Sequence, residues 1–366
     1  MMSRREFLAS MGVMLAATGC NGADPAQLAT AGAPSQNPIF GRVIDVHGHL
    51  HGTPQEFAGS IEAAVQQMTA LGVATAILMP PPQPAGAGNN YDADELLTAI
   101  TASSSPGRFR FMAGGGTLNV MVQQAIAAGY LTSQQNGAFT ALRDSFQAQA
   151  ESIRARGAVG FGELACEHFS FNPGHPYVSA PPDHPLFLLL AEVAARLGVP
   201  LDIHMEAVPG PEPFVVPPRL QGGNTPPTVP PNIPQFETLL RHNGAAHNVI
   251  WDHLGFDNTN FRTPELTRQL MSSHANLYVS MDVLQGHQSQ NLILDNGVVK
   301  PEWVDVMRMF PNRFLLGADQ FFRAPGAAGG QDTPDSFSGT LSILQSLPED
   351  LALQVAFGNA QALLRL

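Results

Sequence analysis

Three histidines and one aspartate alternate in the stretch VIDVHGHLHG, residues 43–52: Asp45, His47, His49 and His51. The stretch begins with the β-branched and apolar residues of a buried strand. Because alternate residues of a strand point to the same side, we expect Asp45, His47 and His49 to share one face. Imidazoles and carboxylates gathered in this way are the ligands that proteins offer to Zn²⁺ and similar ions.

Four other short apolar runs end in the same residue types. The residues of these types near their ends are Glu163 (VGFGEL), His204 (LDIHME), His253 (VIWDHLG) and Asp319 (FLLGADQ). A single buried histidine is more often a core residue than a ligand, but five such strand ends meet if the strands form a parallel barrel. We therefore expect one metal site built from these residues and the first-strand histidines. Asp45 would lie one layer deeper, to orient a ligand or close the barrel floor.

Eight short apolar runs separated by helical stretches predict a (β/α)8 TIM barrel with long loops on its C-terminal face. Continuous apolar runs are typical of strands that are buried on both faces. The runs are 42–47, 74–79, 109–114, 158–163, 199–204, 248–253, 276–281 and 313–319. An open doubly wound sheet is the alternative, but no G-x-G-x-x-G follows the first run.

Three local patterns add detail to this fold. Thr53, Pro54 and Glu56 offer an N-cap, a first-turn proline and a capping box for a helix that should stop at Gly72. We interpret AGGGT at 113–117 as a barrel turn rather than a phosphate loop. Two proline-rich connections, 166–182 and 206–234, are long enough to be functional loops.

The N-terminus has the pattern of an exported bacterial protein. Residues 1–20 resemble a twin-arginine signal peptide, with Arg4 and Arg5 before a short apolar run, and they end in a lipoprotein-like box at Cys20. Residues 21–38 have the composition of a flexible tether, and the catalytic domain would span 39–366. We expect a periplasmic protein or a membrane-anchored lipoprotein, with contact to the membrane only through lipidation of Cys20.

The composition restricts the partners. A formal net charge of −12 disfavours a nucleic-acid partner, and the second cysteine, Cys166, has no partner for an intramolecular disulfide once Cys20 belongs to the signal. We expect a small-molecule substrate, and a homo-oligomer stays open.

From residue 39 onward the sequence resembles the amidohydrolase superfamily, most nearly its amidohydrolase-2-like branch, through the first-strand H-x-H pair, the strand-end residues and the closing GNAQALLRL. The resemblance implies that His47 and His49 bind a metal, and that His204 and His253 are ligands or polarise the substrate. It also implies that Asp319 binds the metal and takes a proton from water.

The fourth strand separates subtypes of this family. Many members bridge two metals there with a carboxylated lysine, but the only lysine here is Lys300, far from that strand. Glu163 stands in the corresponding place, as in TatD-like nucleases, where a glutamate can hold or bridge metals. We expect one or two divalent ions, with Zn²⁺ the first candidate. The alternative role for Glu163 is to orient His204 without binding metal.

The resemblance favours a hydrolase that activates water to cleave an ester, lactone, amide or phosphoester bond, with Asp319 as general base and His253 or His204 at the oxyanion. Two alternatives stay open: a metal-dependent non-oxidative decarboxylase, and a non-catalytic exported lipoprotein that binds metal. The acidic composition argues against a nuclease of the TatD type.

Several further residues are candidates for the substrate cleft. They are Glu167, His168, His175, His287 and Arg323. A Cys166–His168 nucleophile is disfavoured, since neighbours in sequence need not meet in space. Asp252 should point away from His253, across the strand, and have a structural role. His51 lies beyond the first strand, so nothing in the pattern keeps it with the ligands.

Overall fold

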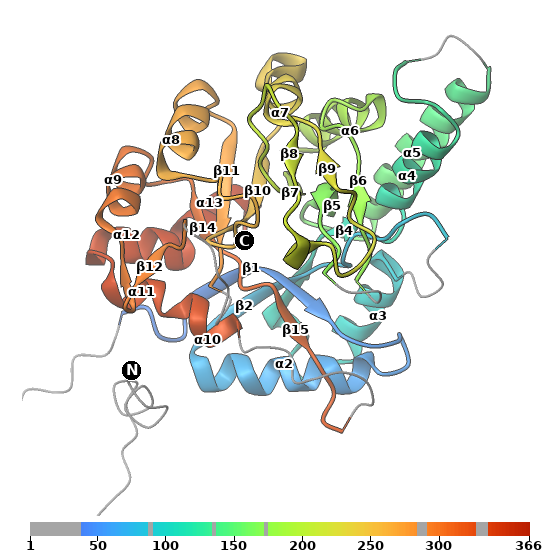
Figure 1. The fold of residues 1–366 in the computed structure, drawn as a ribbon. Helices are drawn as coiled ribbons and strands as arrows, with labels where there is room; N and C mark the ends of the chain where they lie inside the picture. The colour runs from blue at the N-terminus through green and yellow to red at the C-terminus, as the bar shows by residue number, and fades with distance from the viewer. Residues whose placement is uncertain (1–37, 87–90, 134–136, 172–174, 284–290, 327–335) are drawn as a thin grey trace, which may run out of the picture. The chain divides into compact units, whose positions relative to one another are not determined.

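Eight parallel strands and the helices between them make up most of the computed structural model, which describes residues 38–366 apart from 87–90, 134–136, 172–174, 284–290 and 327–335 (Figure 1). The strands are β1 (Val43–Leu50), β2 (Val73–Leu78), β3 (Phe109–Phe111) with β4 (Ala113–Gly114), β5 (Phe161–His168), β7 (Leu201–Met205), β10 (Val249–Leu254), β11 (Leu277–Met281) and β14 (Phe314–Leu316). Each predicted apolar run overlaps one of them.

The sheet closes into a barrel through β3 and β4, which are two parts of one strand. The strands neighbour one another in the order β3-β2-β1-β14-β11-β10-β7-β5-β4, and only Met112 lies between β3 and β4. The order therefore begins and ends on the same segment of chain. Backbone bonds on both sides of this segment complete the closure, from Met112 N–H to Leu78 O and from Val159 N–H to Phe111 O. This confirms the predicted (β/α)8 barrel.

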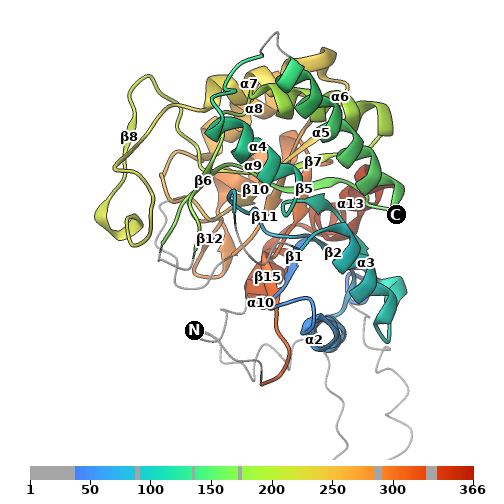
Figure 2. The same cartoon turned by 90° about the vertical axis from the view of Figure 1, so that its right-hand side faces the viewer.

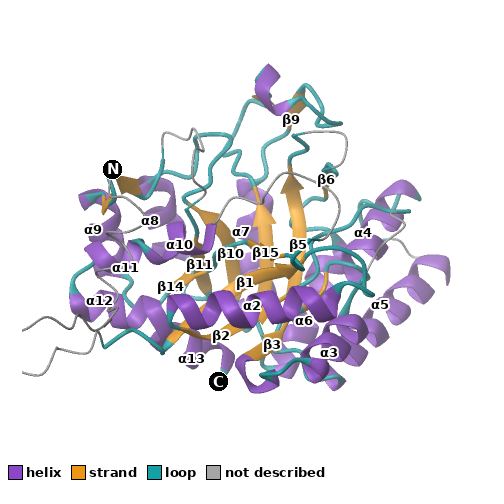
Figure 3. Cartoon of the chain, turned by 90° about the horizontal axis from the view of Figure 1, so that it is seen from below, coloured by secondary structure: helices purple, strands orange, loops and turns teal. Residues whose placement is uncertain are grey.

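Helices cover the outside of the strands, as Figures 1 and 3 show. They are α2 (Phe57–Leu71), α3 (Ala93–Ala102), α4 (Leu118–Ala127), α5 (Gly137–Ala155), α6 (Pro185–Leu197), α7 (Ile233–Arg241), α8 (Pro264–Ser273), α9 (Pro301–Met309), α10 (Ser336–Leu341), α11 (Ile343–Ser346), α12 (Glu349–Leu353) and α13 (Asn359–Leu364). Every residue of β1, β5 and β10 is buried, as expected for strands between side-chain layers and helices.

Two predicted boundaries are wrong. Helix α2 begins at Phe57, not directly after Thr53, because the Glu56 carboxylate accepts the N–H and hydroxyl of Thr53 and holds residues 53–56 in a turn. Helix α2 does stop at Gly72, which has a left-handed φ of 70°. Strand β5 continues to His168, so Cys166 belongs to a strand and not to the following loop.

The two long loops pack against each other above the barrel. The first carries β6 (Val178–Ser179), which pairs antiparallel with the end of β5. The second carries the hairpin of β8 (Phe214–Val215) and β9 (Thr228–Val229), which projects from the body of the domain in Figure 2. A small apolar cluster joins them, formed by Phe169, Val208, Val216, Leu220 and Val229. These loops are therefore ordered parts of the wall above the strand ends.

The N-terminal predictions concern residues that the structure does not describe. The predicted signal peptide, 1–20, and all but the last residue of the tether, 21–38, lie outside the described residues. Export, lipidation of Cys20 and the domain boundaries stay predictions. Among the described residues, no helix combines the length and the apolar character needed to cross a bilayer.

The glycine run at 114–116 is a packing feature, in agreement with its interpretation as a turn. A Cβ on Gly115 would lie 2.4 Å from Pro80 O and 2.8 Å from Glu163 O. A Cβ on Gly116 would lie 2.0 Å from Tyr91 O. Because these neighbours are backbone atoms, which cannot rotate away, only glycine fits beside the strand that carries Glu163.

We predict that Gly115→Ala lowers the free energy of unfolding by about 1–3 kcal/mol, because the added methyl overpacks a backbone contact. Gly107→Ala is the matched control, since a Cβ there meets nothing within 4 Å, and we expect it to change stability by less than about 0.5 kcal/mol. Urea unfolding followed by circular dichroism measures both. Equal midpoints for the two variants would contradict the packing role of Gly115.

Candidate metal centre

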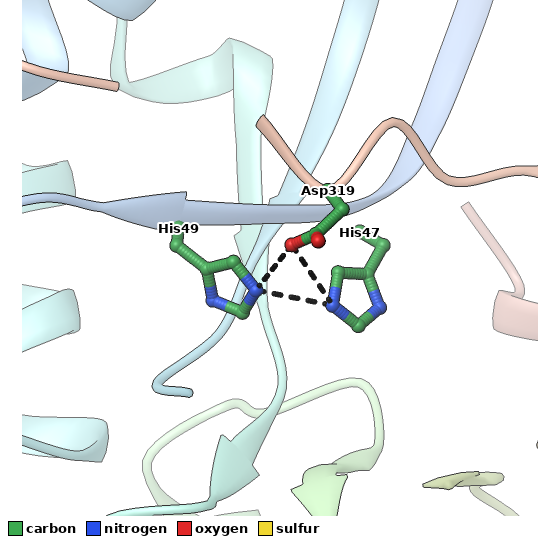
Figure 4. Close-up of side chains that lie close together, drawn as sticks. All are labelled: His47, His49 and Asp319. Carbon is green, nitrogen blue, oxygen red and sulfur yellow. Dashed lines mark hydrogen bonds and ion pairs between the residues drawn. The ribbon is translucent and has the colours of Figure 1, made fainter. Parts of the chain in front are cut away.

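Side chains from the first and last barrel strands meet at the C-terminal end of the barrel. Nε2 of His47 and Nε2 of His49 lie 3.1 Å apart. Asp319 follows β14, and its Oδ1 lies 3.1 Å from His49 Nε2 and 4.0 Å from His47 Nε2 (Figure 4). Three potential ligand atoms thus surround one point, as the spacing of these residues predicted.

Glu163 lies at the centre of the remaining histidines. Its Oε1 is 2.7 Å from His204 Nδ1 and 3.4 Å from His253 Nε2. Its Oε2 is 3.5 Å from His47 Nε2 and 3.4 Å from His49 Nε2. One buried carboxylate therefore contacts four imidazoles from three different strands, and all six predicted ligands form one cluster.

Neighbouring acceptors fix the protonation of the two first-strand histidines. Nδ1 of His49 lies 2.8 Å from the carbonyl of Met79, which can only accept, so Nδ1 carries a proton and Nε2 is the nitrogen that faces Asp319. Nδ1 of His47 faces two carboxylates, 3.5 Å from Asp202 Oδ1 and 3.6 Å from Asp252 Oδ1. Such outer partners orient an imidazole so that Nε2 is presented to a metal.

The backbone is strained where two of the predicted ligands lie. His253 has φ 62° and Asp319 has φ 50°, in the left-handed region that is uncommon outside glycine, although Asn, Asp and His adopt it more often than other residues. The turn at Asp319 is held by two hydrogen bonds, from Asp319 N–H to His47 O and from Ala318 N–H to Asp45 Oδ1. Strain of this kind is concentrated at functional sites, where the surrounding structure imposes it.

The predicted directions of two aspartates are wrong. Strand β1 has an extra residue between Asp45 and Gly48 relative to β2, so Asp45 shares its side of the sheet with Gly48 and not with the histidines. A Cβ on Gly48 would indeed lie 3.5 Å from Asp45 Oδ2. Asp45 does support a predicted ligand, through the Ala318 bond. Strand β10 has a similar irregularity after Trp251, and Asp252, expected to point away from His253 and to have a structural role, lies against Nδ1 of the predicted ligand His47.

Three further acids belong to the site. Asp202 lies two residues before His204 on the same strand face, and alternation along β7 could have identified it. Asp282 directly follows β11, and its Oδ2 lies 3.6 Å from His253 Nδ1. Its position at the end of a strand could have identified it from the sequence. Glu206 lines the cavity beside the site and follows the same alternation from His204.

A cavity of about 390 Å³ opens above the cluster. Glu163, His204, His253 and Asp319 lie in its wall, so the polar cluster is accessible to a small molecule. The described wall also contains four phenylalanines and three prolines: Phe169, Phe171, Phe256, Phe321, Pro81, Pro82 and Pro176. Its size and its mostly apolar lining with a few convergent polar groups are typical of a small-molecule site.

The predicted cleft residues have different positions. His168 and His175 line the cavity and stack with ring centroids 4.5 Å apart. Glu167 points elsewhere and accepts the Ser179 hydroxyl at 2.9 Å. Arg323 contacts His51, with Nη2 3.0 Å from its Nε2, and is not part of the described wall. His287 lies outside the described residues.

The cluster favours positive charge. Burial alone would lower the pKa of His47, but Asp202 and Asp252 outweigh it and hold the pKa well above its usual value. Burial would raise the pKa of Asp319, but the hydrogen bond with His49 and the nearby imidazoles lower it to about 2. Glu163 and Asp319 therefore stay ionised beside His47 and His253, whose pKa values are held well above the usual value, whereas burial and Asp252 raise the pKa of Asp202. A divalent ion can replace the protons of these histidines, since metal and proton compete for the same lone pairs.

The residues present fit such an ion. Two triads have ligand atoms within 4.8 Å of one another at the cavity: His47, His49 and Asp319, and His47, Glu163 and His253. Nitrogen and carboxylate ligands in groups of three leave a coordination position for water, as in catalytic zinc sites. Metal sites also have acids that contact the ligands and orient them. Asp202 and Asp252 make such contacts with His47, and Asp282 makes one with His253.

Comparison by sequence gives no relative: no family model and no curated protein matches the chain. Comparison of structures finds an amidohydrolase from Mycobacterium avium subsp. paratuberculosis, at 12% identity and a TM-score of 0.41 over 88% of this chain and 99% of the other.

Two decarboxylases are also found. One is dihydroxybenzoic acid decarboxylase from Polaromonas sp. JS666 with bound manganese and 2-nitroresorcinol (14% identity, TM-score 0.48, 88% and 97% of the two chains). The other is 2,6-dihydroxybenzoate decarboxylase from Rhizobium (13%, 0.45, 88% and 98%). Because identities and TM-scores are this low, we base the function on the side chains of the site.

Glu167 gives a prediction on pH dependence. Burial raises its pKa to about 8, from 4.5 in an unfolded chain. Between these two values the folded chain holds one more proton than the unfolded chain, so the free energy of unfolding falls as pH rises. Glu167→Gln cannot lose this proton. We expect its stability relative to wild type to increase by up to about 1.4 kcal/mol per pH unit from pH 5 to 8, measured by urea unfolding. If the free energies of unfolding of wild type and Glu167→Gln changed in parallel with pH, the buried, protonated state of Glu167 would be refuted.

Proposed function

We propose that the chain is a metal-dependent hydrolase of the amidohydrolase superfamily, which cleaves an ester, lactone, amide or phosphoester bond of a small molecule. The observation that carries the proposal is the convergence of His47, His49 and Asp319 on one point at the edge of the cavity. Glu163 beside them would take the place that a carboxylated lysine has in other members of that superfamily.

One or two divalent ions would be held here. His47, His49 and Asp319 form the first set of ligands, and Glu163 with His253 extends the cluster toward a second position. The mixture of imidazole nitrogen and carboxylate oxygen makes Zn²⁺ the first candidate. A bound divalent ion would supply a Lewis acid and would lower the pKa of a water molecule toward neutrality.

Asp319 has the position of a general base. Its carboxylate reaches both the predicted ligands and the cavity, and its low pKa keeps it ionised and ready to accept a proton from the attacking water. The proton would then pass from Asp319 to the leaving group. The held turn at Asp319 fixes the direction of the carboxylate during both transfers.

His204 and His253 have the position of oxyanion-stabilising groups. Both imidazoles line the cavity. Nδ1 of His204 contacts Glu163 and Nδ1 of His253 contacts Asp282, so a carboxylate orients each ring. A group fixed before the reaction stabilises developing charge without reorganisation. The two imidazoles, with ring centroids 4.6 Å apart, would receive the oxygen of the scissile carbonyl or phosphoryl group.

The proposal predicts stoichiometric metal in purified wild-type protein and its loss in His47→Ala. Removing one ligand of the first set should leave an incomplete site, so the metal content should fall to a small fraction of wild type. His242→Ala is the control, because His242 pairs with Glu192 at the surface, away from the site. Plasma mass spectrometry after gentle purification measures all three. Metal retained in His47→Ala would refute the site.

The same protein preparations test the reaction. In Asp319→Asn we expect turnover of aryl esters or lactones to fall by roughly 10²–10⁴-fold, the usual contribution of a general base. Undiminished turnover would refute the role of Asp319. Release of carbon dioxide from hydroxybenzoates, without ester or lactone cleavage, would show a decarboxylase instead.

Asp202 and Asp252 both contact Nδ1 of His47, so we predict that replacing one and then both lowers the metal affinity in steps. Asp252→Asn should weaken Zn²⁺ binding by roughly 10-fold, and the Asp202→Asn/Asp252→Asn double variant should weaken it further, because partners behind the ligands typically contribute 10–100-fold. Competition with a chromogenic chelator measures the affinity. Asp305→Asn, on the exposed side of α9, is the control. Unchanged affinity in the double variant would show that His47 needs no support from these carboxylates.

A further inference from the structure

The wall of the cavity has an unusual balance of charge. Its described residues include three carboxylates, Glu163, Glu206 and Asp319, but no lysine or arginine. The five internal ranges that the structure does not describe also contain no lysine or arginine in their sequence. A bound metal would compensate Glu163 and Asp319, which lie in the ligand cluster. Glu206 lies outside that cluster and has no such compensation.

The carboxylate of Glu206 is held in place at the cavity. The amide side chain of Asn258 donates to Oε1, and the Asn258 backbone N–H donates to Oε2 at 3.2 Å. Its backbone is fixed as well, with the N–H bonded to Glu167 O and the carbonyl bonded to the Asn232 side chain. Since a carboxylate offers about four acceptor positions, lone pairs stay available on the cavity side.

The charge of Arg262 acts on Glu206, but neither nearby arginine enters the described wall. The guanidinium of Arg262 stacks on Trp251, 4.2 Å from the ring centroid, and donates to the carbonyl of Asp252. Arg262 is buried and outside the described wall, as is Arg323 beside His51. An anionic group of a substrate in this part of the cavity would therefore face Glu206 without a cation to bind it.

The rest of the wall fits a flat ring. Phe171 and Phe256 meet edge to face, with centroids 6.2 Å apart, and Phe321 packs on His49 at 4.5 Å. Glu206 lies two residues beyond His204 on the same side of the chain, which places it roughly 6–7 Å farther along the strand direction. A ring that packs against these phenylalanines could thus extend from the metal ligands toward Glu206.

We infer that the substrate is an aromatic ester, lactone or amide whose end remote from the scissile bond is an uncharged hydrogen-bond donor, such as a hydroxyl, received by Glu206. This inference rests on the proposed function and narrows its substrate class. Glu206 is then a specificity-determining residue: it accepts a hydrogen bond from a hydroxylated ring and repels a ring that carries a carboxylate or phosphate at the same position.

Three ketones that cannot be hydrolysed test the inference by binding alone. They are 4-hydroxyacetophenone, 4-methoxyacetophenone and 4-acetylbenzoate, titrated into zinc-loaded full-length protein by calorimetry. We expect the hydroxy ketone to bind wild type roughly 10-fold or more tightly than either other compound. In Glu206→Gln, which keeps the shape of the side chain, we expect the discrimination against 4-acetylbenzoate to fall by roughly 10-fold.

Glu167→Gln is the matched control, a buried glutamate on a neighbouring strand that does not line the described wall. It should rank the ketones as wild type does. Equal or tighter binding of 4-acetylbenzoate by wild type, an unchanged ranking in Glu206→Gln, or no binding of any ketone would each overturn the inference. Metal content separates the two proposals: protein without stoichiometric metal refutes the hydrolase, whereas metal-loaded protein that prefers 4-acetylbenzoate refutes only the substrate class.

Discussion

The contact between the Glu163 carboxylate and four histidines is the interaction on which the site depends. Its two oxygens reach His204 and His253 on one side and His47 and His49 on the other. Burial opposes ionisation of this carboxyl, but the hydrogen bonds from the imidazoles hold its pKa well below the usual value. A buried negative charge is stable only with such partners, so the cluster of histidines and the charge of Glu163 require each other.

Further carboxyl groups surround this centre in a second layer, where burial and Asp252 raise the pKa of Asp202 well above its usual value. Asp202 and Asp252 stand behind His47, Asp282 stands behind His253, and all three are buried. So many acids within one low-dielectric volume would be unfavourable without compensating cations. No lysine or arginine joins the described cluster, which makes a metal ion the simplest source of the missing charge and explains why the pKa values of His47 and His253 are held well above the usual value.

Much of this arrangement could be predicted from the sequence. Continuous apolar runs identified all eight strands, because parallel strands buried on both faces must be apolar throughout. Strand ends then identified His47, Glu163 and Asp319 without knowledge of the fold's details. The directions of Asp45 and Asp252 could not be predicted, since each depends on a bulge that one extra residue creates in β1 or β10. Glu206 and Asp282 were not predicted, because Glu206 lies two residues beyond His204 and Asp282 follows an apolar run, 276–281, that itself contains no acid or histidine.

The closure of the barrel on a single segment, 109–114, bears on when the proposed metal ligands can come together during synthesis and folding of the chain. The ligands come from β1 at one end of the sequence and from the turn after β14 near the other, with β5, β7 and β10 between them. The full set is present only once synthesis has passed residue 319, and no local unit of two or three helices and strands can form it. An ion held by the full set would therefore require strands from almost the whole length of the barrel to be assembled.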